Sequence, residues 1–190
     1  MTIPGLAPAV EPRRWRAVTV CSVALVEAAL IWRIGWTAPL AAYCSLGLAL
    51  TLAAVVDART LTMPNLVLWP SYAVGLGLLA AAAGVDGTWW PLGRAVIAMA
   101  AVAAFYLALA LVAGGQRMGL ADVTFGGLVG LLLGWASWSA LTTGVVLGWV
   151  VALVAVLALR PARGRPGIPA VPAGPCLWLG ALVALLATRW

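Results

Sequence analysis

Long apolar segments, each about as long as a bilayer is thick when helical, follow one another along most of the chain and are separated by short breaks. Hydrophobic residues make up 65% of the 190 residues and charged residues only 8%, whereas about 25% charged residues is usual for a soluble domain. A helix satisfies its backbone hydrogen bonds within one segment, as hydrocarbon requires. The sequence therefore predicts an all-α fold, a polytopic integral membrane bundle of about six to seven transmembrane helices.

Prolines, glycines and polar residues divide the apolar sequence into seven expected helices. Their expected ranges are 17–35, 38–56, 65–84, 91–113, 122–136, 139–159 and 173–189. The fifth and sixth together are short for two full spans, so the turn near Ala136 and Ser137 must be tight. Residues 1–16 are expected to form a cytoplasmic N-terminal segment. Residues 17–190 form one membrane-embedded domain with a Pro/Arg-rich cytoplasmic loop at 160–175.

Arginine supplies every basic residue of this chain, whose net charge is +6. If the N-terminus is cytoplasmic, eight arginines fall in inner segments and three, Arg33, Arg94 and Arg189, on the outer side. This asymmetry is the one that the positive-inside rule predicts. Seven of the eleven tryptophans also fall near predicted outer ends, as an interfacial aromatic belt would. Because membrane topology explains the arginines, no nucleic-acid partner is expected.

The first apolar run follows Arg13, Arg14 and Arg16 and looks like a secretory signal, but it is long and lacks a clear small-residue cleavage site. We interpret it as a retained helix. It contains Glu27, whose carboxyl is costly in hydrocarbon. A polar contact buried within the bundle is the preferred interpretation of Glu27, and a catalytic role is the alternative.

Histidine is absent from the sequence, which excludes His-based triads and His-ligated metals. The three cysteines lie inside apolar runs without CxxC spacing, so we interpret them as small packing residues. No metal and no other cofactor is expected.

Two of the five acidic residues, Asp57 and Asp122, lie where an apolar segment meets a short polar loop on the expected cytoplasmic face. A carboxylate beside hydrocarbon is a functional candidate because it is costly there. Steps of four residues along each helix lead from each aspartate through small residues, which allow membrane helices to approach closely. These stripes are Ala53, Ala49, Ser45 and Ala41 in one helix and Gly126, Gly130 and Gly134 in the other. We predict that the two helices pack together and bring the carboxyls near each other.

Two neighbouring carboxyl groups cannot easily both ionise, so one carries a proton and the other a charge. The charged group can take a proton from water while the protonated one polarises a peptide carbonyl, which is aspartic-protease chemistry. The pair titrates as a unit, so the sequence does not say which aspartate is protonated. Capping is the structural alternative: Asp122 as an N-cap, and Asp57 as a helix end bonded to the loop through Arg59, Thr60 or Thr62.

Three segments of this chain resemble the type IV prepilin peptidase family, the prepilin leader peptidases. Residues 57–65, DARTLTMPN, resemble its first catalytic segment, an Asp followed by a polar stretch and a hydrophobic-Pro-Asn triplet. Residues 119–125, GLADVTF, resemble its Gly-x-Gly-Asp segment, which opens a helix. Residues 168–180, IPAVPAGPCLWLG, resemble the Pro-rich sequence before the last helix. With the layout of the spans, the resemblance covers roughly residues 40–190.

The resemblance implies an aspartic endopeptidase of a cell's inner membrane, active in type IV pilus assembly or protein secretion. It would cut the leader from prepilin-like or pseudopilin precursors at the cytoplasmic face. Carried over residue by residue, Asp57 and Asp122 form the catalytic pair and Gly119 gives its loop a turn. Pro64 and Asn65 would begin the third helix, where proline is tolerated because its missing N–H is not needed. The expected cleft lies between the second, third and fifth helices.

Two departures from the family pattern concern Ala121, at the second glycine of Gly-x-Gly-Asp, and Thr124, where the family often has lysine. Alanine would be unfavourable if position 121 needed a positive φ or a close approach of another backbone. The domain with paired CxxC motifs is absent, so a short form without N-methylation activity is expected. The alternatives are a small proton- or ion-coupled transporter and an inactive relative acting in assembly. The sequence specifies neither the substrate nor the oligomeric state.

Overall fold

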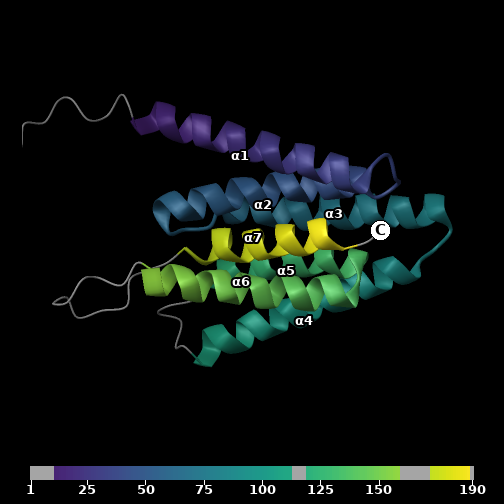
Figure 1. The fold of residues 1–190 in the computed structure, drawn as a ribbon. Helices are drawn as coiled ribbons and strands as arrows, with labels where there is room; N and C mark the ends of the chain where they lie inside the picture. Colours follow the sequence, from purple (N-terminus) through teal and green to yellow (C-terminus); the bar gives the residue numbers. More distant parts are fainter. Residues whose placement is uncertain (1–10, 113–118, 159–171, 189–190) are drawn as a thin grey trace, which may run out of the picture.

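A computed structural model describes residues 11–112, 119–158 and 172–188, and in these ranges it contains seven α-helices and no strand (Figure 1). The helices are α1 (Glu11–Ile34), α2 (Leu40–Thr60), α3 (Asn65–Asp86), α4 (Trp90–Val112), α5 (Leu120–Ala136), α6 (Trp138–Ala158) and α7 (Ala173–Ala187). Five of them are long and apolar enough to cross a membrane, and α5 and α7 are shorter, at 17 and 15 residues. The expected polytopic helical bundle is therefore confirmed.

The helix boundaries agree with the expected ranges to within a few residues except in α1, which begins at Glu11 instead of residue 17. Arginines there extend the first turns of the helix, because Arg is a good helix former. The tight turn between α5 and α6 is confirmed. Ser137 alone joins them: its N–H donates to the Leu133 carbonyl at 3.1 Å and its Oγ accepts the Ala140 N–H at 2.9 Å. Most of the expected loop at 160–175 lies outside the described residues.

The helices run up and down, so Asp57 near the end of α2 and Asp122 near the start of α5 lie at one end of the bundle, here called the aspartate end (Figure 1). The opposite end, here called the tryptophan end, carries exposed indoles. They are Trp32, Trp36, Trp89, Trp90 and Trp138. Five of the seven tryptophans expected at this end are thus exposed there, whereas Trp135 is buried and Trp190 lies outside the described residues.

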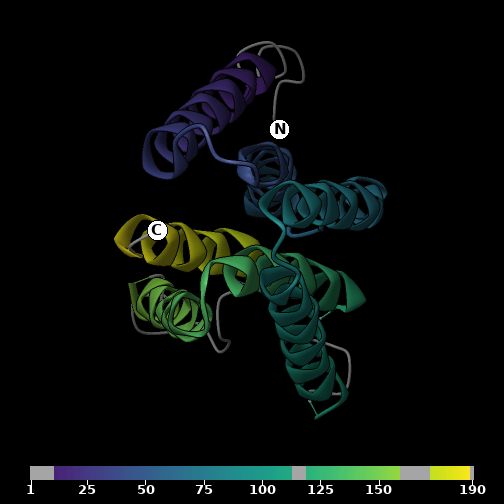
Figure 2. The same cartoon turned by 90° about the vertical axis from the view of Figure 1, so that its right-hand side faces the viewer.

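Helix α5 occupies the centre of the bundle (Figure 2). Every residue from Phe125 to Trp135 is buried. Its glycine stripe faces α4, not α2: a Cβ at Gly130 would lie 2.8 Å from the Ala98 carbonyl oxygen, and one at Gly126 would lie 2.8 Å from the Tyr106 ring. The predicted pairing of the two small-residue stripes is therefore wrong. Glycine lets α5 lie closest to α4, its neighbour in sequence.

Two arginines close the ends of the two short helices. Arg94 of α4 donates to the carbonyls of Gly134 at 2.7 Å and Ala136 at 2.9 Å, and also to that of Trp135. Arg33 of α1 donates to the carbonyl of Leu186 at 2.9 Å and to that of Thr188. The last four carbonyls of a helix lack partners within the helix, and hydrocarbon supplies none. These guanidinium groups supply them where α5 and α7 end.

Helix α1 stands at the edge of the bundle and packs chiefly on α2 (Figure 2). Their contact is closest at Gly47, where a Cβ would lie 3.2 Å from Oε1 of Glu27. This oxygen is buried and has no hydrogen-bond partner among the described residues, and the Glu27 side chain faces Cys44. Cys44 and Asp57 are about 20 Å apart along α2. Glu27 thus lies within the bundle, at the α1–α2 interface and not at the aspartate end, but the polar contact of the preferred interpretation is not found for its Oε1 among the described residues.

Candidate active site

Asp57 lies in the last turn of α2 and is only 5% exposed. Its Oδ2 accepts the backbone N–H of Gly174 at 2.9 Å. Gly174 is the second residue of α7, where the N–H has no partner within the helix and where negative charge is favoured by the helix dipole. The aspartate therefore caps a helix that follows it by more than a hundred residues.

The two helices approach each other closely at Gly174, where a larger residue would make its neighbours shift. A Cβ there would lie 3.0 Å from Oδ2 of Asp57 and 2.9 Å from Cε of Met63. The expected alternative, in which Asp57 bonds its own loop, is wrong. Thr60 instead bonds the Val56 carbonyl and Thr62. The position of the Asp57 carboxyl thus depends on how α7 docks.

Asp122 is half-buried in the first turn of α5. Its Oδ2 accepts the N–H of Gly119 at 2.8 Å, and the Gly119 carbonyl accepts the Asp122 N–H at 3.0 Å. Asp122 therefore does cap its helix, but from the third helical position, reaching back to the N-cap residue Gly119. Gly119 has φ −92° and ψ 163°, an extended conformation that any residue adopts, so the turn does not depend on glycine's freedom there.

The structure brings the two aspartates near each other. Asp122 lies close enough to Asp57 for its charge to act on that carboxyl. Within the described ranges no hydrogen bond joins them, and each carboxyl uses Oδ2 for a backbone N–H. Oδ1 of each side chain has no hydrogen bond to another described residue. The arrangement offers two oriented carboxyls whose second oxygens remain free for water or a substrate carbonyl.

The start of α5 is fixed to α3 by Tyr72, whose hydroxyl donates to the Thr124 carbonyl at 2.7 Å. Thr124 itself turns its hydroxyl to the Leu120 carbonyl at 3.0 Å. Ala121 lies in the first turn of the helix, and Leu61 is the one described non-glycine residue with positive φ. Position 121 therefore does not need the conformational freedom of glycine. At α3, Pro64 is the N-cap and Asn65 the first helical residue, close to their expected role.

Sequence reasoning missed a second α2–α7 contact below Asp57. Nε1 of Trp178 donates to Oγ1 of Thr51 at 3.0 Å, and both side chains are buried. Trp178 follows Gly174 by one helical turn, so the same face of α7 holds Asp57 and Thr51. A tryptophan in mid-span, away from the interfacial belt, together with a buried threonine, was the available signal.

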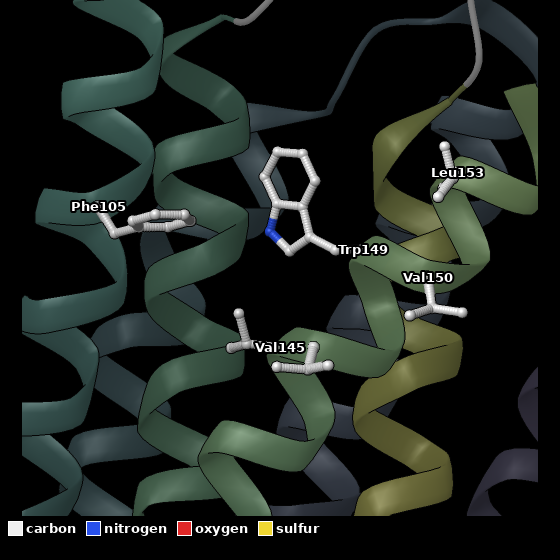
Figure 3. Close-up of a pocket in the computed structure, with 6 residues that line it drawn as sticks. Phe105, Val145, Trp149, Val150 and Leu153 are labelled. Atoms are coloured by element: carbon white, nitrogen blue, oxygen red, sulfur yellow. The ribbon is translucent and has the colours of Figure 1, made fainter.

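A hollow of about 470 Å³ between α4 and α6 is lined entirely by apolar side chains (Figure 3). They are Phe105, Val145, Val146, Trp149, Val150 and Leu153. The Trp149 ring stacks with Tyr106, with centroids 6.2 Å apart, and meets Phe105 edge-on at 6.3 Å. The lining offers no acid or base, so this apolar hollow is not a candidate catalytic site.

No group of three or more His, Cys, Asp or Glu side chains that could hold a metal ion occurs in the part of the chain that the structure describes. Comparison with protein-family models, with curated proteins and with solved structures found no match. The two aspartates and the helix ends that hold them are therefore the features of the molecule that point to a function.

Proposed function

We propose that this chain is a membrane aspartic endopeptidase of the type IV prepilin peptidase family that uses Asp57 and Asp122 to activate water. The observation that carries the proposal is the convergence of these two carboxyls at one end of the bundle, each oriented by a backbone N–H. Among the described residues, neither carboxyl forms an ion pair or a hydrogen bond with another side chain.

The proposed reaction needs only one shared proton. The ionised carboxyl accepts a proton from water as the water oxygen attacks the peptide carbonyl carbon, and the protonated carboxyl donates to the carbonyl oxygen. Collapse of the tetrahedral species breaks the C–N bond, and the proton taken from water passes to the leaving amine. The hydrogen bond to Oδ2 of each aspartate supports this chemistry because it leaves Oδ1 available to the reacting atoms. Holding a catalytic group in the right position increases the rate of the chemical step.

The proposed substrate is a prepilin-like or pseudopilin precursor whose leader lies in the cytoplasm. Arginines at the aspartate end support a cytoplasmic position for it. Arg13, Arg14, Arg16 and Arg59 are exposed there, while Arg33 and Arg94 at the other end are bonded to helix carbonyls. The scissile bond would thus meet the aspartates at the inner face of a cell's inner membrane, with the apolar part of the precursor in the bilayer.

Co-expression with a prepilin-like precursor tests the proposal through the size of the product at matched membrane levels. Asn retains an oxygen that accepts the N–H of Gly174 or Gly119 but cannot exchange a proton. Asp57→Asn and Asp122→Asn should therefore keep the fold and each lose cleavage by about 10²–10⁴-fold. Asp86→Asn, at the end of α3, is the matched control and should cleave normally. Cleavage that survives both aspartate substitutions would rule out this mechanism.

A proton-coupled carrier is the second candidate, and the unpartnered Oε1 of Glu27 in the α1–α2 interface favours it. The two functions separate cleanly. Glu27→Gln should abolish proton-coupled uptake in a carrier, whereas the peptidase should retain cleavage because Glu27 is remote from both aspartates. An inactive relative would show no cleavage of any precursor even as the wild type.

A further inference from the structure

Helices α1 and α2 approach each other at the tryptophan end and separate toward the aspartate end (Figure 1). The close part of the contact includes Leu30 of α1 against Gly47 of α2. At the same end, Arg33 of α1 bonds the end of α7. Toward the aspartate end, Cζ of Arg59 on α2 lies 5.8 Å from the centre of the Trp15 ring on α1.

A hollow of about 470 Å³ opens where the two helices separate. It is lined by Trp15, Arg16, Thr19 and Val20 of α1 and by Arg59 of α2. Both arginines are exposed, and neither forms an ion pair with any described residue. Among the described side chains no carboxylate lines the hollow: Asp57, two residues from Arg59, is buried against α7. The two guanidinium groups therefore line a hollow in which no described carboxylate neutralises them.

The hollow has a charged part, formed by arginines, and an apolar part deeper in the span. An amphiphile with a charged headgroup and an acyl chain would contact both. Guanidinium groups present planar sets of donors that fit phosphate oxygens in pairs, and Trp15 is of the type that favours the headgroup level of a bilayer. One turn further into the span, Val20 is 67% exposed and offers hydrocarbon contact. A free phosphate ion would use only the arginines, whereas a phospholipid would use both parts.

We propose that the hollow between residues 15–20 of α1 and Arg59 of α2 binds the phosphate headgroup of an anionic phospholipid, with an acyl chain along Val20. Basic hollows between membrane helices are suited to such headgroups, and each arginine near the surface contributes about 1 kcal/mol. The lipid fills the gap that protein side chains leave and links α1 to the bundle at the aspartate end. This proposal does not depend on the peptidase assignment.

Native mass spectrometry of the full, delipidated chain tests the proposal by titration with phosphatidylglycerol, with phosphatidylcholine of the same acyl chains, and with inorganic phosphate. The wild type should prefer phosphatidylglycerol. Arg16→Gln combined with Arg59→Gln should weaken that binding by about 25-fold, or about fivefold for each arginine. The matched control, Arg13→Gln with Arg14→Gln, removes the same charge at the same end but outside the hollow, and should change it by about twofold or less.

Three results would overturn the proposal. Equal weakening by the two double variants would mean that diffuse surface charge attracts the lipid. Equal affinity for the two lipids would mean that the phosphate charge is not recognised. Displacement of phosphatidylglycerol by inorganic phosphate at similar concentration would identify a site for a soluble anion instead. Circular dichroism and thermal unfolding of each variant without lipid confirm that the exposed arginines were replaced without loss of the fold.

Discussion

Asp57 and Asp122 differ in what holds them, although both accept a backbone N–H at a helix start. Asp122 bonds Gly119, three residues before it in the same turn. Asp57 bonds Gly174 on a helix that is distant in sequence. The first contact forms wherever α5 forms, whereas the second exists only when α7 is docked on α2. The position of Asp57 relative to Asp122 therefore depends on how α7 packs against α2. Substitutions in the α2–α7 contact should affect function most.

The largest effect that distinguishes the two contacts is expected for Gly174→Ala. Its Cβ would lie 3.0 Å from Oδ2 of Asp57, so the carboxyl or α7 must move. A misplacement of about 1 Å costs a catalytic group about 100-fold in rate; the shift needed here is a few tenths of an ångström, so the expected loss lies between about tenfold and that value. Product formation by the co-expressed precursor measures the loss, and thermal unfolding measures the accompanying change in stability.

Gly119→Ala is the matched substitution on the other aspartate. A Cβ at position 119 would meet Ala121 N at 3.8 Å and Oδ2 of Asp122 at 3.9 Å, which are ordinary contacts. The N–H that bonds Asp122 remains. A stability cost below about 1 kcal/mol is expected, with cleavage almost unchanged. Equal losses for the two alanine variants would show that the proposed difference between the aspartates does not matter for function.

An effect smaller than that of Gly174→Ala is expected for Thr51→Val, which removes the acceptor of the Trp178 N–H while conserving shape. A buried donor left without a partner costs about 1–3 kcal/mol, so unfolding should occur at lower temperature or denaturant concentration. Because Thr51 and Asp57 lie on the same helix and face α7, cleavage should fall by about tenfold if the docking of α7 positions Asp57.

Tyr72→Phe is the corresponding change on the Asp122 side, since it removes the hydroxyl that bonds the Thr124 carbonyl. The expected loss of stability is about 0.5–1.5 kcal/mol. Cleavage should fall less than in Thr51→Val, because the bond between Asp122 and Gly119 remains. The opposite order would mean that α3, and not α7, sets the geometry of the site.

Much of this fold could be predicted from hydropathy and from helix-breaking residues, because each helix forms its backbone hydrogen bonds within its own segment. Seven helices, the tight turn at Ser137 and the common end of the two aspartates all follow from one-dimensional patterns. These patterns do not predict which helix packs against each helix face. The Gly126–Gly134 stripe predicted close packing but not that α4 would supply the partner. Likewise, Asp122 could be recognised as a cap from its own turn, whereas nothing near Asp57 pointed to Gly174.

The two short helices share a feature that only the three-dimensional structure reveals. Asp122 lies in the first turn of α5, and Arg94 of α4 bonds the carbonyls at its end. Asp57 accepts an N–H from the first turn of α7, and Arg33 of α1 bonds the carbonyls at its end. Each is thus placed between an acidic group at its positive end and a basic group at its negative end, as the helix dipole favours. Helices too short to reach both interfaces still have their end groups satisfied. The same aspartates therefore serve structure and, in the proposed function, chemistry, which is why Asn is a more informative substitution than Ala.

The smallest effect is expected for Ala121→Gly, which restores the second glycine of the family's Gly-x-Gly-Asp pattern. Ala121 lies in the first turn of α5 without positive φ, so glycine relieves no strain and costs less than about 1 kcal/mol of helix stability. Cleavage by this variant should stay within about twofold of the wild type. A large increase would mean that position 121 needs space for the substrate backbone, and the Asp122 side would then limit the rate more than the Asp57 side does.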